Sequence, residues 1–200
     1  MIRNPALRGR LGEWAQPMLV GMTERGPDSA GIAVFTEPLD AGLRKLSLNA
    51  PAGFDWSALH AALADGESLE VRANHGTLTS PRPPSAVRAS LAVAFPQLRV
   101  LSTGRAIDLY KDVGTPLEIA TKYGLAGMAG THLVAHTRMA TESAVTPENA
   151  HPYTAGEDWC LVHNGSLSNP YSLRRKLEPL GIAFDGDCDT EAACRWLEWR

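Results

Sequence analysis

The segment RGPDSAGIAVF, residues 25–35, constrains the fold more than any other part of the chain. Its first half contains two glycines and a proline, which favour a tight turn, and the apolar run GIAVF that follows favours a buried strand. Before it, Asn4-Pro5 is typical of a helix cap, and apolar residues then recur at three- and four-residue spacing. We therefore expect a helix over about residues 5–23, bent at Pro17, that turns sharply into a strand.

The middle of the chain, residues 40–113, has a different pattern. DWSALHAALADG and PPSAVRASLAVAF predict helices, SLEVRANHGTLTS predicts a strand pair or one bent strand, and QLRVLSTG predicts a further strand. No recognisable chemistry is found there. We expect a small α+β insert at about residues 40–113 within the main domain.

The main domain is predicted to resume at Gly130. THLVAHTR and DWCLVHNG predict strands, Asn169-Pro170 opens a helix that ends at Gly181, and another helix begins at Asp189. That last helix is still in progress where the chain stops. We therefore expect residues 1–200 to form one α+β domain that is incomplete at both ends.

Composition excludes several classes of function. The 200 residues are 44% hydrophobic and 20% charged, as in globular proteins, and a formal charge of -3 gives no basic field to attract nucleic acid. No apolar run is long enough to cross a membrane, and the first residues lack the core of a signal peptide. The three cysteines have no CxxC spacing, so we expect neither a disulfide framework nor a zinc knuckle. A cytoplasmic protein fits these features best.

Polar groups follow the predicted strands at three places: Arg138, Asn164-Gly165 and Asp189. Arg138 and Asn164 are 26 residues apart, and Asn164 and Asp189 are 25 residues apart. Each separation is long enough for the chain to leave and return through one strand or helix, so the three places can converge. Arg138 offers a planar fork for a carboxylate. The alternative is a structural salt bridge from Arg138 to Glu142 or Glu148.

The other two places also allow two interpretations each. The Asn164 amide and the Gly165 N–H can stabilise an oxyanion, or they can form an Asn-Gly hairpin turn. Asp189 can bind an ammonium group or cap the helix that begins there. Several histidines lie nearby, but they lack a carboxylate or thiolate at metal-ligand spacing, so no metal is expected. No general base that could activate a cysteine as a nucleophile is evident for any of the three, Cys160, Cys188 and Cys194.

Taken together, four segments resemble motifs of the class II glutamine amidotransferases, the N-terminal-nucleophile glutaminase domains. They are RGPDSAG, HTRMAT, VHNGSLSN and CDTEAA, in the order in which that family has them. The longer segments GTHLVAHTRMATESAVTPENAHPY and CLVHNGSLSNPYSLRRKLEPLG are most similar to the stand-alone amidotransferase subunits of the glutamate synthase and N-methylglutamate synthase group. The resemblance implies a four-layer αββα N-terminal-nucleophile hydrolase fold with a small α+β insert.

The resemblance also implies roles for individual residues. Arg138 would bind the α-carboxylate of glutamine, Thr141 would lie beside the bound amino acid, and Asp189 would pair with the α-ammonium group. Arg25 and Gly26 would line the pocket near the nucleophile. These roles follow from the motifs and not from spacing.

The chemistry implied is hydrolysis of glutamine to glutamate and ammonia through a thioester on an N-terminal cysteine, with Asn164 and Gly165 as the oxyanion hole. The complexes of this group carry FMN and an iron-sulfur cluster on the partner subunits, so no cofactor is expected on this chain. Its expected partners are glutamine and glutamate-synthase-like subunits, without nucleic acid or membrane.

The chain departs from the family at its start, MIRNPALRG, where the family has Met-Cys-Gly-Ile followed by a strand. An internal cysteine cannot substitute for the nucleophile because it has no free α-amine. Two interpretations remain open. Either the start was placed late or the N-terminus was removed, or the chain is a non-catalytic amino-acid-binding or assembly subunit.

Overall fold

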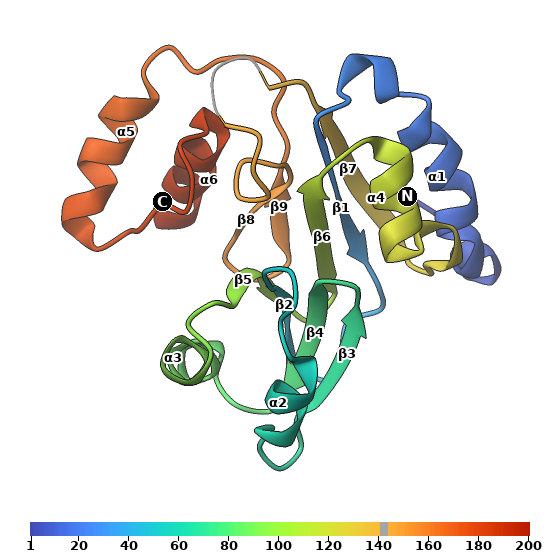
Figure 1. Cartoon of the computed structure of the whole chain (residues 1–200), viewed down its shortest axis with the longest axis vertical. Helices are drawn as coiled ribbons and strands as arrows, with labels where there is room; N and C mark the ends of the chain where they lie inside the picture. Colours follow the sequence, from blue (N-terminus) through green and yellow to red (C-terminus); the bar gives the residue numbers. More distant parts are fainter. Residues whose placement is uncertain (141–143) are drawn as a thin grey trace.

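The computed structural model describes residues 1–140 and 144–200. Its helices and strands form a mixed α+β fold with antiparallel sheets (Figure 1). The α-helices are α1 (Leu11–Val20), α2 (Trp56–Ala61), α3 (Pro84–Ala94), α4 (Pro116–Tyr123), α5 (Pro170–Leu177) and α6 (Asp189–Trp199). The strands are β1 (Ser29–Phe35), β2 (Arg44–Asn49), β3 (Ser68–Arg72), β4 (His75–Ser80), β5 (Arg99–Gly104), β6 (Ile107–Val113), β7 (His132–Arg138), β8 (Tyr153–Ala155) and β9 (Trp159–Leu161).

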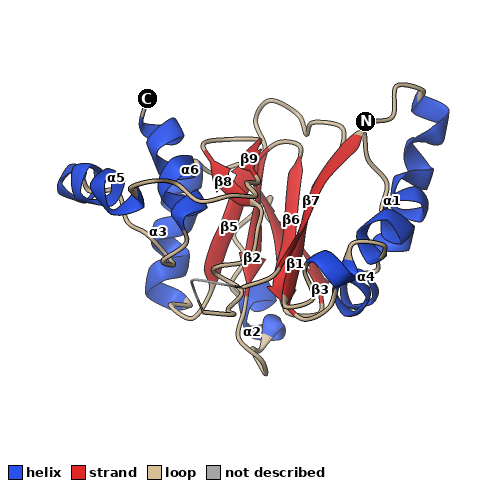
Figure 2. Ribbon diagram, turned by 90° about the horizontal axis from the view of Figure 1, so that it is seen from above, coloured by secondary structure: helices blue, strands red, loops and turns tan. Residues whose placement is uncertain are grey.

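The first sheet has the strand order β6-β1-β7, and every residue of β1 is buried. This confirms the strand predicted from GIAVF, whose continuous apolar run is typical of a strand covered on both faces. Helices α1 and α4 cover one face, with Leu19, Ile32 and Tyr123 in a shared apolar core. In Figure 2 the strands lie between this helix pair and the pair α5 and α6. The antiparallel register places Arg138, at the end of β7, opposite Ser29.

The N-terminal helix is divided into two parts. A 3-10 helix, Pro5–Arg10, precedes α1, and Pro17 lies inside α1. The side chain of Asn4 accepts a hydrogen bond from the Ala6 N–H at 3.1 Å. The predicted cap is thereby confirmed.

The second sheet, β3-β4-β2-β5, is formed by residues 44–104. SLEVRANHGTLTS forms an antiparallel strand pair, which settles the choice left open between a pair and one bent strand. The strand β6, although it falls inside the range 40–113, pairs with β1 in the first sheet. The two helices predicted in this range are present as α2 and α3, and α2 ends earlier than DWSALHAALADG predicts.

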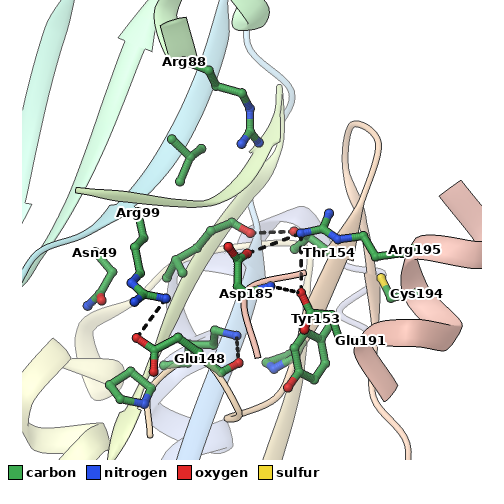
Figure 3. A pocket seen from close by; sticks show the side chains of 15 residues that line it. Asn49, Arg88, Arg99, Glu148, Tyr153, Thr154, Asp185, Glu191, Cys194 and Arg195 are labelled. Carbon is green, nitrogen blue, oxygen red and sulfur yellow. Dashed lines mark hydrogen bonds and ion pairs between the residues drawn. The ribbon is translucent and has the colours of Figure 1, made fainter. Parts of the chain in front are cut away.

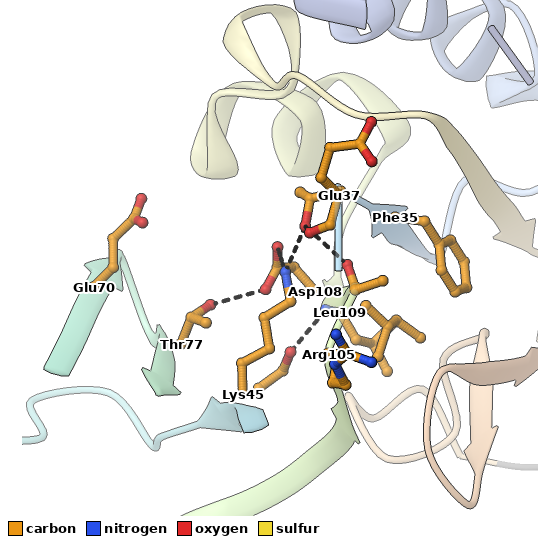
Figure 4. A network of polar contacts seen from close by, with 12 residues as sticks. Phe35, Glu37, Lys45, Glu70, Thr77, Arg105, Asp108 and Leu109 are labelled. Carbon is orange, nitrogen blue, oxygen red and sulfur yellow. Dashed lines mark hydrogen bonds and ion pairs between the residues drawn. The ribbon is translucent and has the colours of Figure 1, made fainter. Parts of the chain in front are cut away.

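Polar contacts join the two sheets (Figure 4). The buried ammonium group of Lys45 on β2 lies 2.8 Å from the Asp108 carboxylate on β6 and donates a hydrogen bond to Thr36 at 2.9 Å. The hydroxyl of Ser47 accepts a hydrogen bond from the Leu109 N–H at 2.9 Å. Since each of these buried polar groups has a partner, the cost of removing it from water is compensated. The contacts therefore define how the two sheets are positioned relative to each other.

Helix α4 begins with a complete capping box. The Thr115 hydroxyl accepts a hydrogen bond from the Glu118 N–H, and the Glu118 carboxylate accepts one from the Thr115 N–H at 2.8 Å. We expect Thr115→Ala to lower the free energy of unfolding by about 1 kcal/mol because the Glu118 N–H loses its acceptor and the Glu118 carboxylate loses the Thr115 hydroxyl as a donor. Urea unfolding measures this change. Thr121→Ala, on the exposed face of the same helix, is the control and should not destabilise the protein.

The last part of the chain forms the hairpin of β8 and β9 and the helix pair α5 and α6. Asn169 caps α5 by accepting a hydrogen bond from the Ser172 N–H at 2.9 Å, as predicted. Helix α6 packs against β8 and β9. Across residues 1–140 and 144–200, no helix has both the length and the hydrophobicity that crossing a membrane requires.

Candidate functional site

A cavity of about 550 Å³ lies where the ends of several elements meet. It is bounded by the short helix Thr23–Arg25, the end of β7, the loop after β9 and the start of α6. Most of the residues predicted from sequence line it: Arg25, Arg138, Asn164, Gly165 and Asp189. The structure therefore places a guanidinium group, an amide and a carboxylate around one cavity.

One predicted residue is placed differently, because Gly26 is not among the residues that line the cavity. Gly26 is buried behind the cavity wall, and a Cβ atom added there would lie 2.4 Å from the carbonyl carbon of Thr137. Glycine is thus required for the close approach of this turn to β7. Thr141 lies outside the described residues.

Arg138 is buried, with 8% of its surface exposed, at the end of β7. Its Nη1 donates a hydrogen bond to the Ala144 carbonyl at 3.4 Å. Asp28 holds the backbone that follows the Arg138 side chain, because its N–H donates to the Arg138 carbonyl at 3.1 Å and its carboxylate accepts from the Ala140 N–H at 2.8 Å. Sequence reasoning did not identify this supporting role, although Asp28 stands within the RGPDSAG turn.

Glu142 and Glu148 were the salt-bridge partners considered for Arg138. The carboxylate of Glu148 pairs with Arg99, with Oε1 3.0 Å from the guanidinium Nη1. Glu142 lies outside the described residues. Glu148 is therefore engaged with a different arginine.

Asp189 is the first residue of α6, and Cys188 occupies the cap position without a side-chain cap hydrogen bond. The Asp189 carboxylate instead accepts a hydrogen bond from the Leu167 N–H at 2.7 Å, which ties α6 to the loop before α5. Burial alone would raise the pKa of Asp189, but hydrogen bonds from Leu167 and Thr190 hold it below its ordinary value. The group is an anion at neutral pH, at the edge of the cavity.

Asn164 and Gly165 lie in the exposed loop between β9 and α5. The element that follows is a helix, so this pair does not form the two-residue hairpin turn that was considered. Gly165 has φ of 152°, a conformation that favours glycine, and an added Cβ would lie 3.0 Å from His163 Nε2. The N–H of Gly165 is consequently not screened by any side chain of its own.

Histidines form one wall of the cavity. The rings of His136 and His151 are 4.5 Å apart, and the His151 ring meets the Tyr153 ring edge-on at 5.1 Å. His151 is 4% exposed, and neither of its nitrogens has a hydrogen-bond partner in the part of the chain that the structure describes. Burial, together with nearby His136, lowers the pKa of His151 to about 3, so the ring is neutral. The described residues contain no group of side chains arranged to hold a metal ion.

A second cavity, of about 560 Å³, adjoins the first. It runs between α1 and β7, and both cavities are lined by Arg25, His136, Thr137 and Asn164. The exposed apolar side chains of Trp14, Met18 and Met22 line its far side. Among the described residues β7 pairs with β1 alone, so this groove runs beside an open strand edge.

Comparison with known proteins accords with this geometry. The profile of the family described as "Glutamine amidotransferases class-II" matches residues 118–199. Over 200 residues, covering 98% of this chain, the sequence is 39% identical to the glutamine amidotransferase-like protein GlxB of Rhizobium meliloti. The chain belongs to the class II glutamine amidotransferases.

Other relatives of this amidotransferase match about half of the chain. A putative glutamine amidotransferase of Methanothermobacter thermautotrophicus is 38% identical over 49% of the chain. The glutamine–fructose-6-phosphate aminotransferase of Francisella tularensis is 37% identical over 52%. The chain spans 66% of the length of the GlxB protein, 33% of the second relative and 17% of the third.

Proposed function

We propose that this domain binds glutamine in the 550 Å³ cavity and serves as the glutaminase part of an amidotransferase. A free amino acid carries a carboxylate and an ammonium group, and it needs a cation and an anion at one site. The observation that carries the proposal is that Arg138 and Asp189 line the same cavity. In the proposed complex Arg138 binds the α-carboxylate, Asp189 binds the α-ammonium group, and Thr141, Arg25 and Gly26 shape the pocket.

The side-chain amide of glutamine would then extend toward Asn164 and Gly165. A cysteine thiol attacks the amide carbon, the oxyanion that forms accepts hydrogen bonds from the Asn164 amide and the Gly165 N–H, and ammonia leaves. Water then attacks the thioester and releases glutamate. The α-amine of an N-terminal cysteine, with an ordinary pKa of about 7.7–8.0, can accept and return the proton at neutral pH.

The groove beside β7 supports the proposed source of this nucleophile. A strand placed before Met1 could pair with the open edge of β7, cover Trp14, Met18 and Met22, and bring its first residue to Asn164, where the two cavities meet. With this strand added, the sheets and helix pairs would match a four-layer αββα N-terminal-nucleophile hydrolase. We propose that the ammonia serves glutamate-synthase-like subunits, with FMN and the iron-sulfur cluster on those partners.

Binding can be tested on the chain as it stands. We expect isothermal titration calorimetry to detect glutamine binding, and we expect Arg138→Lys to weaken it about tenfold, since a lysine cannot form two parallel hydrogen bonds to a carboxylate. Arg44→Lys, at an exposed ion pair with Glu157, is the matched control and should bind like the parent chain. Unchanged affinity in Arg138→Lys would remove Arg138 from the pocket.

Catalysis is tested on a chain extended at its N-terminus by Met-Cys-Gly-Ile and a strand. Release of ammonia by the extended chain, and none by the chain without the cysteine, is the expected result. Glutamine binding without hydrolysis in both forms would instead support a non-catalytic amino-acid-binding or assembly subunit.

A further inference from the structure

A smaller, strongly charged cavity of about 50 Å³ lies apart from the glutamine cavity (Figure 3). The second sheet, β6, the loop before β8, and α6 meet around it, and it shares no lining residue with the glutamine cavity. Four cationic side chains from four elements line it: Arg88 on α3, Arg99 on β5, Lys111 on β6 and Arg195 on α6. The proposed glutaminase chemistry does not use any of them.

The carboxylates at this cavity are already engaged. Glu148 pairs with Arg99 at 3.0 Å and Asp185 pairs with Arg195 at 3.4 Å. Glu191 accepts hydrogen bonds from the backbone N–H groups of Asp185 at 2.8 Å and Gly186 at 2.9 Å. Four cations and three anions line the cavity, and a fourth carboxylate, that of Glu198, pairs with Arg195 at 3.2 Å.

Within the described part of the chain, Arg88 and Lys111 have no ion pair. Arg88 donates one hydrogen bond, to the Thr103 hydroxyl at 2.8 Å, and a guanidinium group has five N–H donors. Lys111 is buried and donates to the carbonyl oxygens of Glu148 at 3.1 Å and Ala150 at 2.8 Å, and its ammonium nitrogen lies 4.5 Å from the centre of the Tyr153 ring. Arg88 therefore retains unused donors, whereas Lys111 is largely engaged.

Arg195 adds a further unused donor. Its Nε is buried and has no hydrogen-bond partner in the described residues, although its other nitrogens contact Asp185 and Glu198. Arg88 on α3 and Arg195 on α6 line the same cavity. Burial and then the nearby charge of Arg195 lower the pKa of Arg88, whereas the carboxylates of Glu198 and Asp185 raise it. An anion between the two guanidinium groups would add to the compensation that these carboxylates give.

We propose that this cavity binds a small tetrahedral oxyanion, either phosphate or the phosphate group of a monoester, between Arg88 and Arg195. The cavity is rich in donors, so a fitting ligand must bring acceptor oxygens. Since one water needs about 10–15 Å³ on this scale, the volume suits about four oxygen-sized groups, as a phosphate has. The bound anion would join α3 of the second sheet to α6, whose first residue is Asp189.

The test uses the full chain and does not depend on glutamine turnover. Inorganic phosphate at about 100 times its Kd is expected to raise the melting temperature by about 5 °C above that in sodium chloride of equal ionic strength. Calorimetric titration is expected to show that Arg88→Gln and Arg195→Gln each weaken phosphate binding at least about tenfold. Circular dichroism verifies that each variant is folded. Arg175→Gln, which removes an exposed arginine from α5, should leave the affinity unchanged.

A second titration with glycerol 1-phosphate identifies the source of the anion. Binding comparable to that of phosphate assigns the site to a monoester, and binding of inorganic phosphate alone assigns it to the free ion. The proposal is overturned if phosphate gives no shift beyond chloride, or if Arg175→Gln weakens binding as much as Arg88→Gln does. Glutamine binding measured in parallel keeps this result separate from the proposed glutaminase function.

Discussion

Replacing Asn164 by alanine in the chain extended to an N-terminal cysteine is expected to lower kcat for glutamine hydrolysis about 10²–10³-fold. The Asn164 amide lies at the junction of the two cavities, where the cysteine and the amide carbon would meet. Its donors would act mainly on the oxyanion and less on the bound substrate. The affinity for glutamine, measured by calorimetry, should therefore change much less than the rate.

Ser168→Ala is the matched control for this prediction, because Ser168 is exposed in the same loop and does not line the 550 Å³ cavity. It should hydrolyse glutamine at the rate of the extended parent. If Asn164→Ala lost affinity in proportion to its rate, Asn164 would be a substrate-binding residue and the oxyanion role would be wrong.

Mild acid is expected to destabilise the fold by about 4 kcal/mol between pH 7 and pH 5 through His75 and His151. Burial lowers the pKa of each to about 3, whereas an unfolded histidine has a pKa of about 6.5. Below pH 6.5 the unfolded chain takes up protons that the folded chain does not, so stability falls as the pH falls from 6.5 toward 3. Each histidine contributes about 2 kcal/mol of this loss at pH 5.

The surroundings of His75 explain why it stays neutral. It is 1% exposed, its Nε2 accepts a hydrogen bond from the Lys111 N–H at 3.3 Å, and its Nδ1 lies 3.2 Å from the Asn74 side-chain oxygen. These partners assign the ring proton to Nδ1. A second proton on Nε2 would break the bond to Lys111 and place a charge between the rings of Tyr110 and Tyr123.

Urea unfolding at pH 7 and pH 5 measures the effect. His151→Phe should reduce the loss to about half, because it removes one titrating group whose nitrogens have no hydrogen-bond partner among the described residues. His60→Gln, at an exposed histidine, should retain the full loss. An undiminished pH dependence in His151→Phe would show that this ring is protonated in the folded protein.

Helices and strands that are determined by neighbouring residues could be predicted from the sequence. Elements that depend on pairing with distant residues could not. The cap at Asn169 and the buried strand β1 follow from local chemistry, and both were predicted. Helix α4 was missed, although Thr115-Pro-Leu-Glu118 is a capping-box signature. Strand β6 was not assigned because its residues IDLYKDV mix charged and apolar types, and its pairing with β1 joins residues that are 72 (Phe35 and Ile107) to 84 (Ser29 and Val113) positions apart in the chain.

The candidate site shows the same division. Arg138, Asn164 and Asp189 could be predicted to converge because each lies in a recognisable motif, and Arg138 and Asn164 each follow a predicted strand. The supporting groups could not be predicted. The Asn149 side-chain oxygen accepts a hydrogen bond from the Asp187 N–H at 3.2 Å, and its amide donates to the Ala144 carbonyl at 3.1 Å. Partners of this kind are backbone groups, which carry no signature in the sequence.

The two hydrogen bonds of Asp28 to the backbone around Arg138 have a consequence for how such domains diverge. The turn before β1 and the end of β7 are more than 100 residues apart in the chain, yet these hydrogen bonds join them directly. A substitution in the first motif would displace the guanidinium group without touching any ligand. Homologous domains should therefore exchange these two segments only as a pair, and chimeras that combine them from different parents should lose selectivity for their amino acid.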